Sequence, residues 1–441
     1  MDIITHTFEN GFRVVWEKSY NLIPLTSVYV FCDVGSIHEP SDLKGAAHFI
    51  EHMCFKGTRK IPLAKDIFNK YDEIGAYFNA TTEKQYTEYH VRTQDQYTGH
   101  CINIMSDMLL NSIFNKSEFV KEEQVVIEEN IKNSDRTTVI IATVSDSLVY
   151  RGSNYELPID TLEYHNKPFE YNKVVKMFKQ YYQPSNMILS ISSNLPFNDI
   201  IKMVKKSNFM KKNEKMVKPY NLCYTKASIQ TEIQYKLFEK VDLNTIQLSL
   251  SFRTCPNDSP DRYKLNMLKR ILSGTLGSRI FLLLRENNGL TYSSSVYTEY
   301  LEHIGEFTIF CEMNKLKLIH NNKKKGVLPL IINMVNDLIN NGITDKELKR
   351  AHTNFVGSEL FKHENNGVQA VYNGIELLQN IDKKIVPYSE IYNTYYKHIG
   401  KSDIDQVIQT YLKKQNMNVG LVGSNLIKLS IIQSECEKLT R

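Results

Sequence analysis

One short segment constrains the fold more than any other: residues 48–52 have the sequence HFIEH, with two histidines four positions apart. On an α-helix, positions i and i+4 lie one above the other, so His48 and His52 would point in the same direction. The apolar stripe that would bury the opposite face of such a helix is also present, at Ala47, Ile50, Met53 and Cys54. The segment therefore predicts a helix with one buried face and one face that presents two imidazoles.

On this predicted helix Glu51 lies next to the two imidazoles. Neutral imidazoles suit zinc (Zn2+), and a carboxylate near a water on the metal can accept its proton. His48 and His52 are therefore candidate metal ligands, and Glu51 is a candidate general base. The alternative interpretation is a polar helix face that carries two surface histidines.

A catalytic zinc site needs three protein ligands and one open position, so a third ligand must come from elsewhere. Residues 118–130 predict a strongly acidic helix, which carries Glu122, Glu123, Glu128 and Glu129. Glu122 and Glu129 lie two turns apart and share a face of this helix. Carboxylates at this density repel one another unless water or a cation neutralises some of them. A solvated acidic face is the alternative to a metal ligand here.

A chain of 441 residues is too long for one ordinary core and predicts two domains. A Lys- and Asn-rich stretch makes residues 206–226 the predicted linker between domains at 1–205 and 227–441. Two dipeptides of the first half recur in the second: Gly57-Thr58 as Gly274-Thr275, and Asn186-Met187 as Asn416-Met417. These echoes favour a duplicated domain. The same offset places Leu265, Leu268 and Lys269 where the first half has the HFIEH polar residues, so only the first half is predicted to retain the chemistry.

Composition excludes several classes of partner. The net charge of +5 is small and spread along the chain, which indicates neither nucleic acid nor an acidic membrane surface as a partner. The seven cysteines form no CxxC pair, so neither a zinc ribbon nor a disulfide framework is predicted. We find no run of 18 apolar residues and no visible presequence. We therefore expect a soluble, intracellular protein, cytoplasmic rather than mitochondrial.

Residues 48–58, HFIEHMCFKGT, closely resemble the active-site helix of the pitrilysin/insulinase family of zinc metallopeptidases (M16), with its inverted HxxEH motif. The resemblance implies that His48 and His52 bind zinc. It also implies a third ligand about 77 residues after the second histidine, and Glu129 lies 77 residues after His52. In that family a further glutamate precedes this ligand by seven residues and orients a ligand histidine, a position that Glu122 occupies. Glu128 is the rival third ligand.

Two further segments resemble substrate-binding elements of the same family. Residues 75–82, GAYFNATT, are similar to its substrate-binding edge strand, with Asn79-Ala80 as the usual pair. An exposed strand edge can add an extended peptide as one more strand, although a plain edge strand is the alternative. Arg285 and Tyr292 match an Arg-x6-Tyr element that reaches the family's active site from the opposite half. A guanidinium and a phenol can donate hydrogen bonds to a substrate carbonyl or an oxyanion.

The resemblance implies an α+β fold with two homologous domains, each a mainly antiparallel sheet backed by helices, which together form half of a clamshell. It is strongest for the shorter members, those like the mitochondrial processing peptidase and its bacterial relatives. The implied function is that of a zinc-dependent endopeptidase acting on peptides or unfolded segments. Because two of four domains are present, a homodimer or a heterodimer with a related subunit is implied. The alternative is a non-catalytic scaffold or subunit of a processing-peptidase-like heterodimer.

Overall fold

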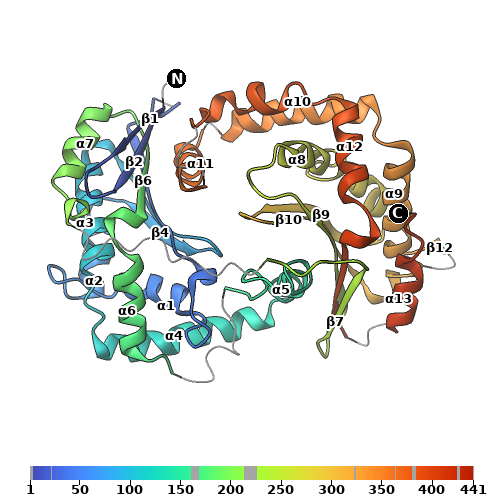
Figure 1. The fold of residues 1–441 in the computed structure, drawn as a ribbon, viewed down its shortest axis with the longest axis horizontal. Helices are drawn as coiled ribbons and strands as arrows, with labels where there is room; N and C mark the ends of the chain where they lie inside the picture. Colours follow the sequence, from blue (N-terminus) through green and yellow to red (C-terminus); the bar gives the residue numbers. More distant parts are fainter. Residues whose placement is uncertain are drawn as a thin grey trace. The chain divides into compact units, whose positions relative to one another are not determined.

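The computed structural model describes residues 3–20, 22–159, 168–212, 226–321, 324–362, 364–379, 384–424 and 428–440. Most of the predicted linker at 206–226 lies outside these ranges. The chain divides into two compact units, and each unit is built from three separate segments (Figure 1). Unit 1 comprises Met1–Lys132, Pro158–Cys223 and Ser358–Ile391, and unit 2 comprises Asn133–Leu157, Tyr224–Gly357 and Tyr392–Arg441. These units differ from the predicted domains at 1–205 and 227–441 because each half of the chain contributes one segment to the other unit.

Unit 1 contains a six-stranded sheet in the order β1-β2-β6-β3-β5-β4. The strands are β1 (Ile3–Thr7), β2 (Arg13–Lys18), β3 (Leu25–Cys32), β4 (Tyr77–Thr82), β5 (Thr87–Gln94) and β6 (Met187–Ser193). All neighbouring strands are antiparallel except β2 and β6, which are parallel. A turn at Asn10-Gly11 joins β1 to β2, with Gly11 at a positive φ of 80° that favours glycine. The strand β4 lies at one edge of the sheet.

Helices cover both faces of the unit 1 sheet. The central strand β3 shows why: Val28 and Val30 enter one hydrophobic core while Tyr29 and Phe31 enter another. A strand buried on both faces needs a covering layer on each. One layer holds α1 (Ala46–Cys54), α2 (Ala64–Asp72), α3 (Thr98–Asn111), α4 (Lys116–Asp135), α6 (Tyr171–Tyr181) and α7 (Phe197–Lys205). The other face carries α11 (Asn366–Gln379), which comes from the second half of the chain (Figure 1).

Unit 2 contains a five-stranded sheet in the order β7-β13-β8-β10-β9. The strands are β7 (Gln234–Glu239), β8 (Thr245–Thr254), β9 (Thr291–Tyr300), β10 (Gly305–Asn314) and β13 (Met417–Gly423), and a separate two-stranded ribbon joins β11 (His320–Asn321) and β12 (Lys324–Lys325). Its helices are α8 (Asp261–Leu272), α9 (Val327–Asn341), α10 (Asp345–Lys362), α12 (Lys401–Tyr411) and α13 (Leu429–Cys436). The first half of the chain supplies α5 (Thr137–Val149), which packs on β8 and β13.

The two sheets share one topology, because β2-β6-β3-β5-β4 and β7-β13-β8-β10-β9 follow the same order of connection. The parallel pair also corresponds, since β13 is parallel to β7 as β6 is to β2. The predicted fold class, two related sheet-and-helix halves, is therefore confirmed. No helix in the described ranges is long and apolar enough to cross a membrane.

Buried polar side chains dock α11 on the unit 1 sheet. Asn366 Nδ2 donates to the carbonyl of Leu25 at 2.7 Å, and Asn373 Nδ2 donates to a carboxylate oxygen of Glu17 at 2.8 Å. Gly374 lies so close to the sheet that an added Cβ would come within 2.1 Å of the Phe31 ring. The helix is therefore fixed by hydrogen bonds and close contact as well as by apolar burial.

Candidate metal centre

The helix α1 begins at Ala46, directly after Gly45, whose backbone adopts a positive φ of 87°. The buried carboxylate of Glu39 accepts hydrogen bonds from the backbone N–H groups of Gly45 at 2.9 Å and Ala47 at 2.7 Å. These groups have no acceptor within the helix, and a carboxylate at this end also favours the helix dipole. The cap therefore fixes where the helix starts, and with it the direction of the residues one turn later.

The structure brings together the two histidines of α1 and one glutamate of α4. The Nε2 atoms of His48 and His52 lie 3.2 Å apart. Oε2 of Glu129 lies 3.9 Å from Nε2 of His48 and 3.6 Å from Nε2 of His52. These three residues form a group whose ligand atoms lie within 4.8 Å of one another. Glu128, the rival ligand, is exposed and is not a member of this group among the described residues.

The geometry of this group fits zinc. Zinc–nitrogen and zinc–oxygen bonds of about 2.0–2.1 Å in a tetrahedral site place neighbouring ligand atoms about 3.3 Å apart. The three separations between the ligand atoms here, from 3.2 to 3.9 Å, are close to that value. Two imidazoles and one carboxylate are also a donor set that catalytic zinc sites use. The residues present could therefore hold a zinc ion and leave its fourth position open.

Glu122 orients the ring of His52. Oε1 of Glu122 lies 2.8 Å from Nδ1 of His52, so Nδ1 must donate and Nε2 keeps its lone pair for a metal. The other carboxylate oxygen lies 2.5 Å from Nζ of Lys56. Burial works to raise the pKa of Glu122, but the hydrogen bonds from His52 and Lys56 outweigh it and leave that pKa below its ordinary value.

Glu51 lies beside the group and is buried, with 8% of its surface exposed. The hydroxyl of Thr82, on β4, donates to Oε2 of Glu51 at 2.8 Å. Burial raises the pKa of Glu51, against the opposing effects of His48, His52 and the Thr82 hydrogen bond. The predicted general base is thus a desolvated carboxylate held by one hydrogen bond from the neighbouring strand.

The acidic helix α4 is not a uniformly solvated face. Its first two central carboxylates are buried: Glu122 contacts Lys56 and His52, and Glu123 accepts a hydrogen bond from the backbone N–H of Phe169 at 2.6 Å. The next two, Glu128 and Glu129, are exposed, and only the second joins the histidine group. The sequence singled out this helix, but it did not show which contacts neutralise each carboxylate.

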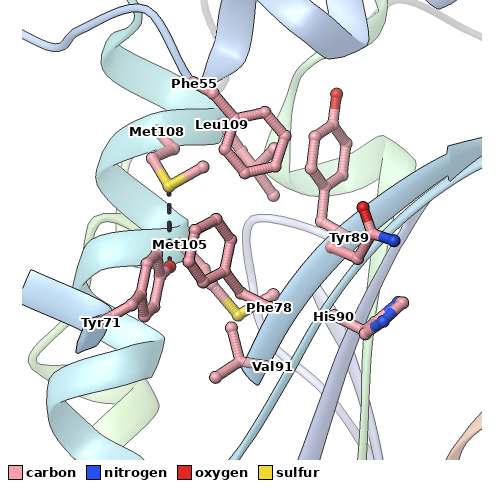
Figure 2. A pocket seen from close by; sticks show the side chains of 10 residues that line it. Phe55, Tyr71, Phe78, Tyr89, His90, Val91, Met105, Met108 and Leu109 are labelled. Carbon is pink, nitrogen blue, oxygen red and sulfur yellow. Dashed lines mark hydrogen bonds between the residues drawn. The ribbon is translucent and has the colours of Figure 1, made fainter. Parts of the chain in front are cut away.

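The predicted substrate strand is the edge strand β4. Asn79 is exposed, and its side-chain oxygen accepts the backbone N–H of Ala80 at 2.9 Å. Among the described residues β4 pairs on one side with β5, so its other side is an open edge. A small apolar hollow of about 10 Å³ lies beside this strand. It is lined by the side chains in Figure 2: Phe55, Tyr71, Phe78, Asn79, Tyr89, His90, Val91, Met105, Met108 and Leu109. Phe55, directly after α1, and Phe78, on β4, both line this hollow.

Arg285 and Tyr292 both lie in unit 2. Arg285 belongs to a π-helical turn, Phe281–Glu286, and its guanidinium donates to the backbone carbonyl of Tyr292. Tyr292 is near the start of the edge strand β9, with 55% of its surface exposed. The two residues therefore contact each other, while the histidine group belongs to unit 1.

The sequence missed two residues that contact this group's neighbours. Lys56 stood within the segment HFIEHMCFKGT but was given no role, and Thr82 was counted as part of the edge strand alone. The sequence did contain an indication for Thr82. Alternation along the strand places Thr82 on the same face as Ala80, the residue predicted to lie near the metal site. No local pattern predicts the contact of Lys56 with Glu122, because the two residues are 66 positions apart.

Comparison with known protein families gives two matches. The family model described as insulinase, peptidase family M16, matches residues 14–159. The model described as the peptidase M16 inactive domain matches residues 168–355. Together the two matches cover most of the chain, and only residues 160–167 lie between them.

Individual proteins agree with these matches. The chain is 29% identical over 369 residues to an uncharacterized zinc protease, YmxG, from Bacillus subtilis, covering 84% of this chain and 86% of that protein. It is 22% identical over 431 residues to the mitochondrial-processing peptidase subunit beta of Dictyostelium discoideum, covering 95% and 88%. Its fold matches the crystal structure of a protease from Helicobacter pylori with a TM-score of 0.86 at 20% identity, over 96% of this chain and 99% of the other.

Proposed function

Because this chain belongs to the insulinase family of peptidases, M16, we propose that it is a zinc-dependent endopeptidase that hydrolyses peptides or unfolded protein segments. The observation that carries this proposal is the convergence of His48, His52 and Glu129, whose ligand atoms lie within 4.8 Å of one another. Relatives named as zinc proteases support the same metal. In this proposal the three residues hold zinc, which when bound supplies the Lewis-acid chemistry that activates water at neutral pH.

Glu51 acts as the general base in the proposed reaction. It accepts a proton from the attacking water and passes it to the amine that leaves when the peptide bond breaks. Its position supports this role, because the carboxylate is buried beside the two imidazoles and held by the hydroxyl of Thr82. A base that is oriented before the substrate arrives loses less entropy on reaching the transition state.

The substrate binds to the open edge of β4 in this proposal. Backbone groups of Asn79 and Ala80 pair with an extended peptide, which gives affinity with little dependence on sequence. A small side chain at Ala80 lets the peptide approach α1 closely. Arg285 and Tyr292 supply hydrogen-bond donors to the substrate carbonyl or to the oxyanion that develops from it.

We further propose that the chain functions as a homodimer or as a heterodimer with a related subunit. The Dictyostelium relative is named as a subunit, which supports an assembly in that branch of the family. Measurement of the solution mass of the purified protein tests this point, and a mass equal to one chain of 51.2 kDa under assay conditions would contradict it.

The proposed function is tested by replacing Glu51 with glutamine. We expect Glu51→Gln to bind zinc as the unmodified chain does and to lose hydrolysis of an unstructured, quenched fluorescent peptide. The matched control is Glu128→Gln, which changes an exposed carboxylate of α4 and should retain full turnover. Hydrolysis by the unmodified chain should stop on zinc chelation and return when zinc is restored. Unchanged turnover in Glu51→Gln would exclude Glu51 as the base, and a zinc-loaded chain that cleaves no unstructured peptide would favour the non-catalytic subunit.

A further inference from the structure

We propose that Lys56 is a positioning residue of the metal centre, which holds His52 in its ligand orientation by anchoring Glu122. This inference rests on the zinc site of the proposed function. It adds a residue that touches neither the metal ligands nor the substrate edge. The chain of contacts runs from Nζ of Lys56 to one oxygen of Glu122 at 2.5 Å, and from the other oxygen to Nδ1 of His52 at 2.8 Å.

The loop after α1 places Lys56 for this contact. The backbone N–H of Lys56 donates to the carbonyl of Met53 at 3.1 Å, so the residue continues the last turn of α1. Gly57 then turns the chain with a φ of 122°, where an added Cβ would lie 2.3 Å from the carbonyl oxygen of Pro62. The backbone carbonyl of Gly57 accepts a hydrogen bond from the N–H of Ile113, which lies just before α4 begins, at 3.2 Å. Backbone hydrogen bonds therefore connect the segment around Lys56 both to α1, which carries the histidines, and to the residues that precede α4.

Lys56 also satisfies a carboxylate that cannot reach bulk water. The Glu122 side chain is only 6% exposed and that of Lys56 is 21% exposed. A buried carboxylate that has lost one of its two partners tends to rotate towards another donor or towards water. Such a rotation would move the oxygen that holds Nδ1 of His52 and release the imidazole ring. Both oxygens of Glu122 must be held for one of them to stay on the ring.

Simple electrostatics predicts the opposite effect on zinc. A lysine near a dication repels it, so removal of the positive charge should tighten zinc binding slightly. A positioning role predicts that removal weakens zinc binding. Lys60 separates the two effects, because it lies in the same loop, is exposed, and would lose the same charge on replacement. The sign of the change in zinc affinity therefore distinguishes a positioning residue from a nearby charge.

The test measures zinc affinity by competition with a fluorescent chelator, without any turnover assay. We expect Lys56→Met to weaken zinc binding about tenfold, within the range for residues that orient metal ligands. Lys60→Met should leave the affinity unchanged or slightly higher. Glu122→Gln should weaken it by about 10- to 100-fold, and adding Lys56→Met to Glu122→Gln should change it by less than about twofold, because the lysine acts through the carboxylate.

Two further measurements distinguish a positioning role of Lys56 from a purely structural packing role. Lys56→Arg keeps a cation at this position and should restore zinc affinity to within about threefold of the unmodified chain, whereas a cavity or packing role would not follow charge. Bound cobalt should show an altered visible absorption spectrum in Lys56→Met and an ordinary one in Lys60→Met. Equal zinc affinities of Lys56→Met and Lys60→Met would overturn the inference, as would an undiminished effect of Lys56→Met in the Glu122→Gln background.

If Lys56→Met does not fold, the same comparison between Lys56→Arg and Lys56→Gln decides the question. Failure of the unmodified chain to bind zinc would instead refute the proposed function.

Discussion

His38 should make unit 1 sensitive to mild acid. His38 is the last residue of the short 3₁₀ turn Ser36–His38. Its Nδ1 accepts the backbone N–H of Gly35 at 3.0 Å, and its ring packs edge-on against Tyr181. Burial lowers the pKa of His38 from its ordinary value of 6.5 to about 4. Between these two pH values the unfolded chain binds a proton that the folded chain excludes. The free energy of unfolding should therefore fall as the pH falls from 6.5 towards 4.

The size of this effect follows from the two pKa values. With a folded pKa of about 4 and an unfolded pKa of 6.5, the loss is about 2 kcal/mol at pH 5 and approaches about 3.4 kcal/mol below pH 4. At pH 7.5 it is below about 0.1 kcal/mol. The perturbation that removes it is His38→Asn, because an asparagine side-chain oxygen can accept the Gly35 N–H but does not titrate in this range.

The assay uses urea unfolding followed by tryptophan fluorescence. The chain has one tryptophan, Trp16, which lies in the core of unit 1 and is 9% exposed, so its signal reports on this unit. A chelator is present throughout, so that zinc does not contribute to the pH dependence. Relative to His38→Asn, the unmodified chain should lose about 2 kcal/mol more between pH 7.5 and pH 5. The control His100→Asn replaces an exposed histidine of α3 and should keep the full pH dependence. Parallel stability curves for the unmodified chain and His38→Asn would refute the reasoning.

Two further predictions test the general base and the packing of α11. Thr82→Val removes the 2.8 Å hydrogen bond to Glu51. A hydrogen bond to a charged group contributes about 1.5–3 kcal/mol, so its loss should lower kcat about 10- to 100-fold. The zinc content of the variant should stay the same. The control Thr81→Val alters the exposed face of the same strand, and an equal fall in kcat there would contradict a specific role for Thr82. Gly374→Ala should destabilise unit 1 by about 1–3 kcal/mol in the tryptophan assay, because its methyl group would meet the Phe31 ring. The control Gly357→Ala has open space around it and lies in unit 2, so its unfolding is followed by circular dichroism, which reports on both units. It should be neutral or slightly stabilising, and the reverse order of stabilities would refute the packing argument.

The elements of each sheet could be predicted from the sequence because their signals are local. Alternation at residues 77–91 predicts a strand, and the structure has two strands there, β4 and β5. Asn10-Gly11, between two apolar runs, predicts the turn before β2. The exchange of helices between the units could not be predicted in this way. On α11, Asn366, Gln369 and Asn373 are almost completely buried, yet such residues ordinarily indicate a solvent-exposed face. Their hydrogen-bond partners lie more than 170 positions away, and no periodicity within the helix identifies them.

In the candidate site too, some residues could be predicted from local sequence and others depend on contacts between elements. The spacing of His48 and His52 fixes their mutual direction once the helix is given, so the sequence alone could place them together. Only a resemblance to a family linked Glu129 to them, because the contact joins α1 to α4 and Glu129 lies 77 positions after His52. Thr82 and Lys56 depend on tertiary contacts of 31 and 66 positions, and their residue types are common on strands and in loops. Local periodicity can thus predict which residues share a face of an element, whereas contacts between elements need the folded chain.

The charges around the histidine group favour a divalent cation there. Glu51 and Glu129 face two imidazoles that are neutral when they act as metal ligands, and the charge of Glu122 is balanced by that of Lys56. Two carboxylates and no net positive charge from the imidazoles give a formal charge of about −2 beside a partly buried surface. A dication brings this sum to zero, whereas protonation of one imidazole would leave it negative and remove a ligand. Burial of Glu51 adds to this preference, because a desolvated carboxylate is stabilised most by a nearby concentrated positive charge. The same carboxylates that would repel one another in a purely structural helix pair therefore become favourable when a metal ion lies between them.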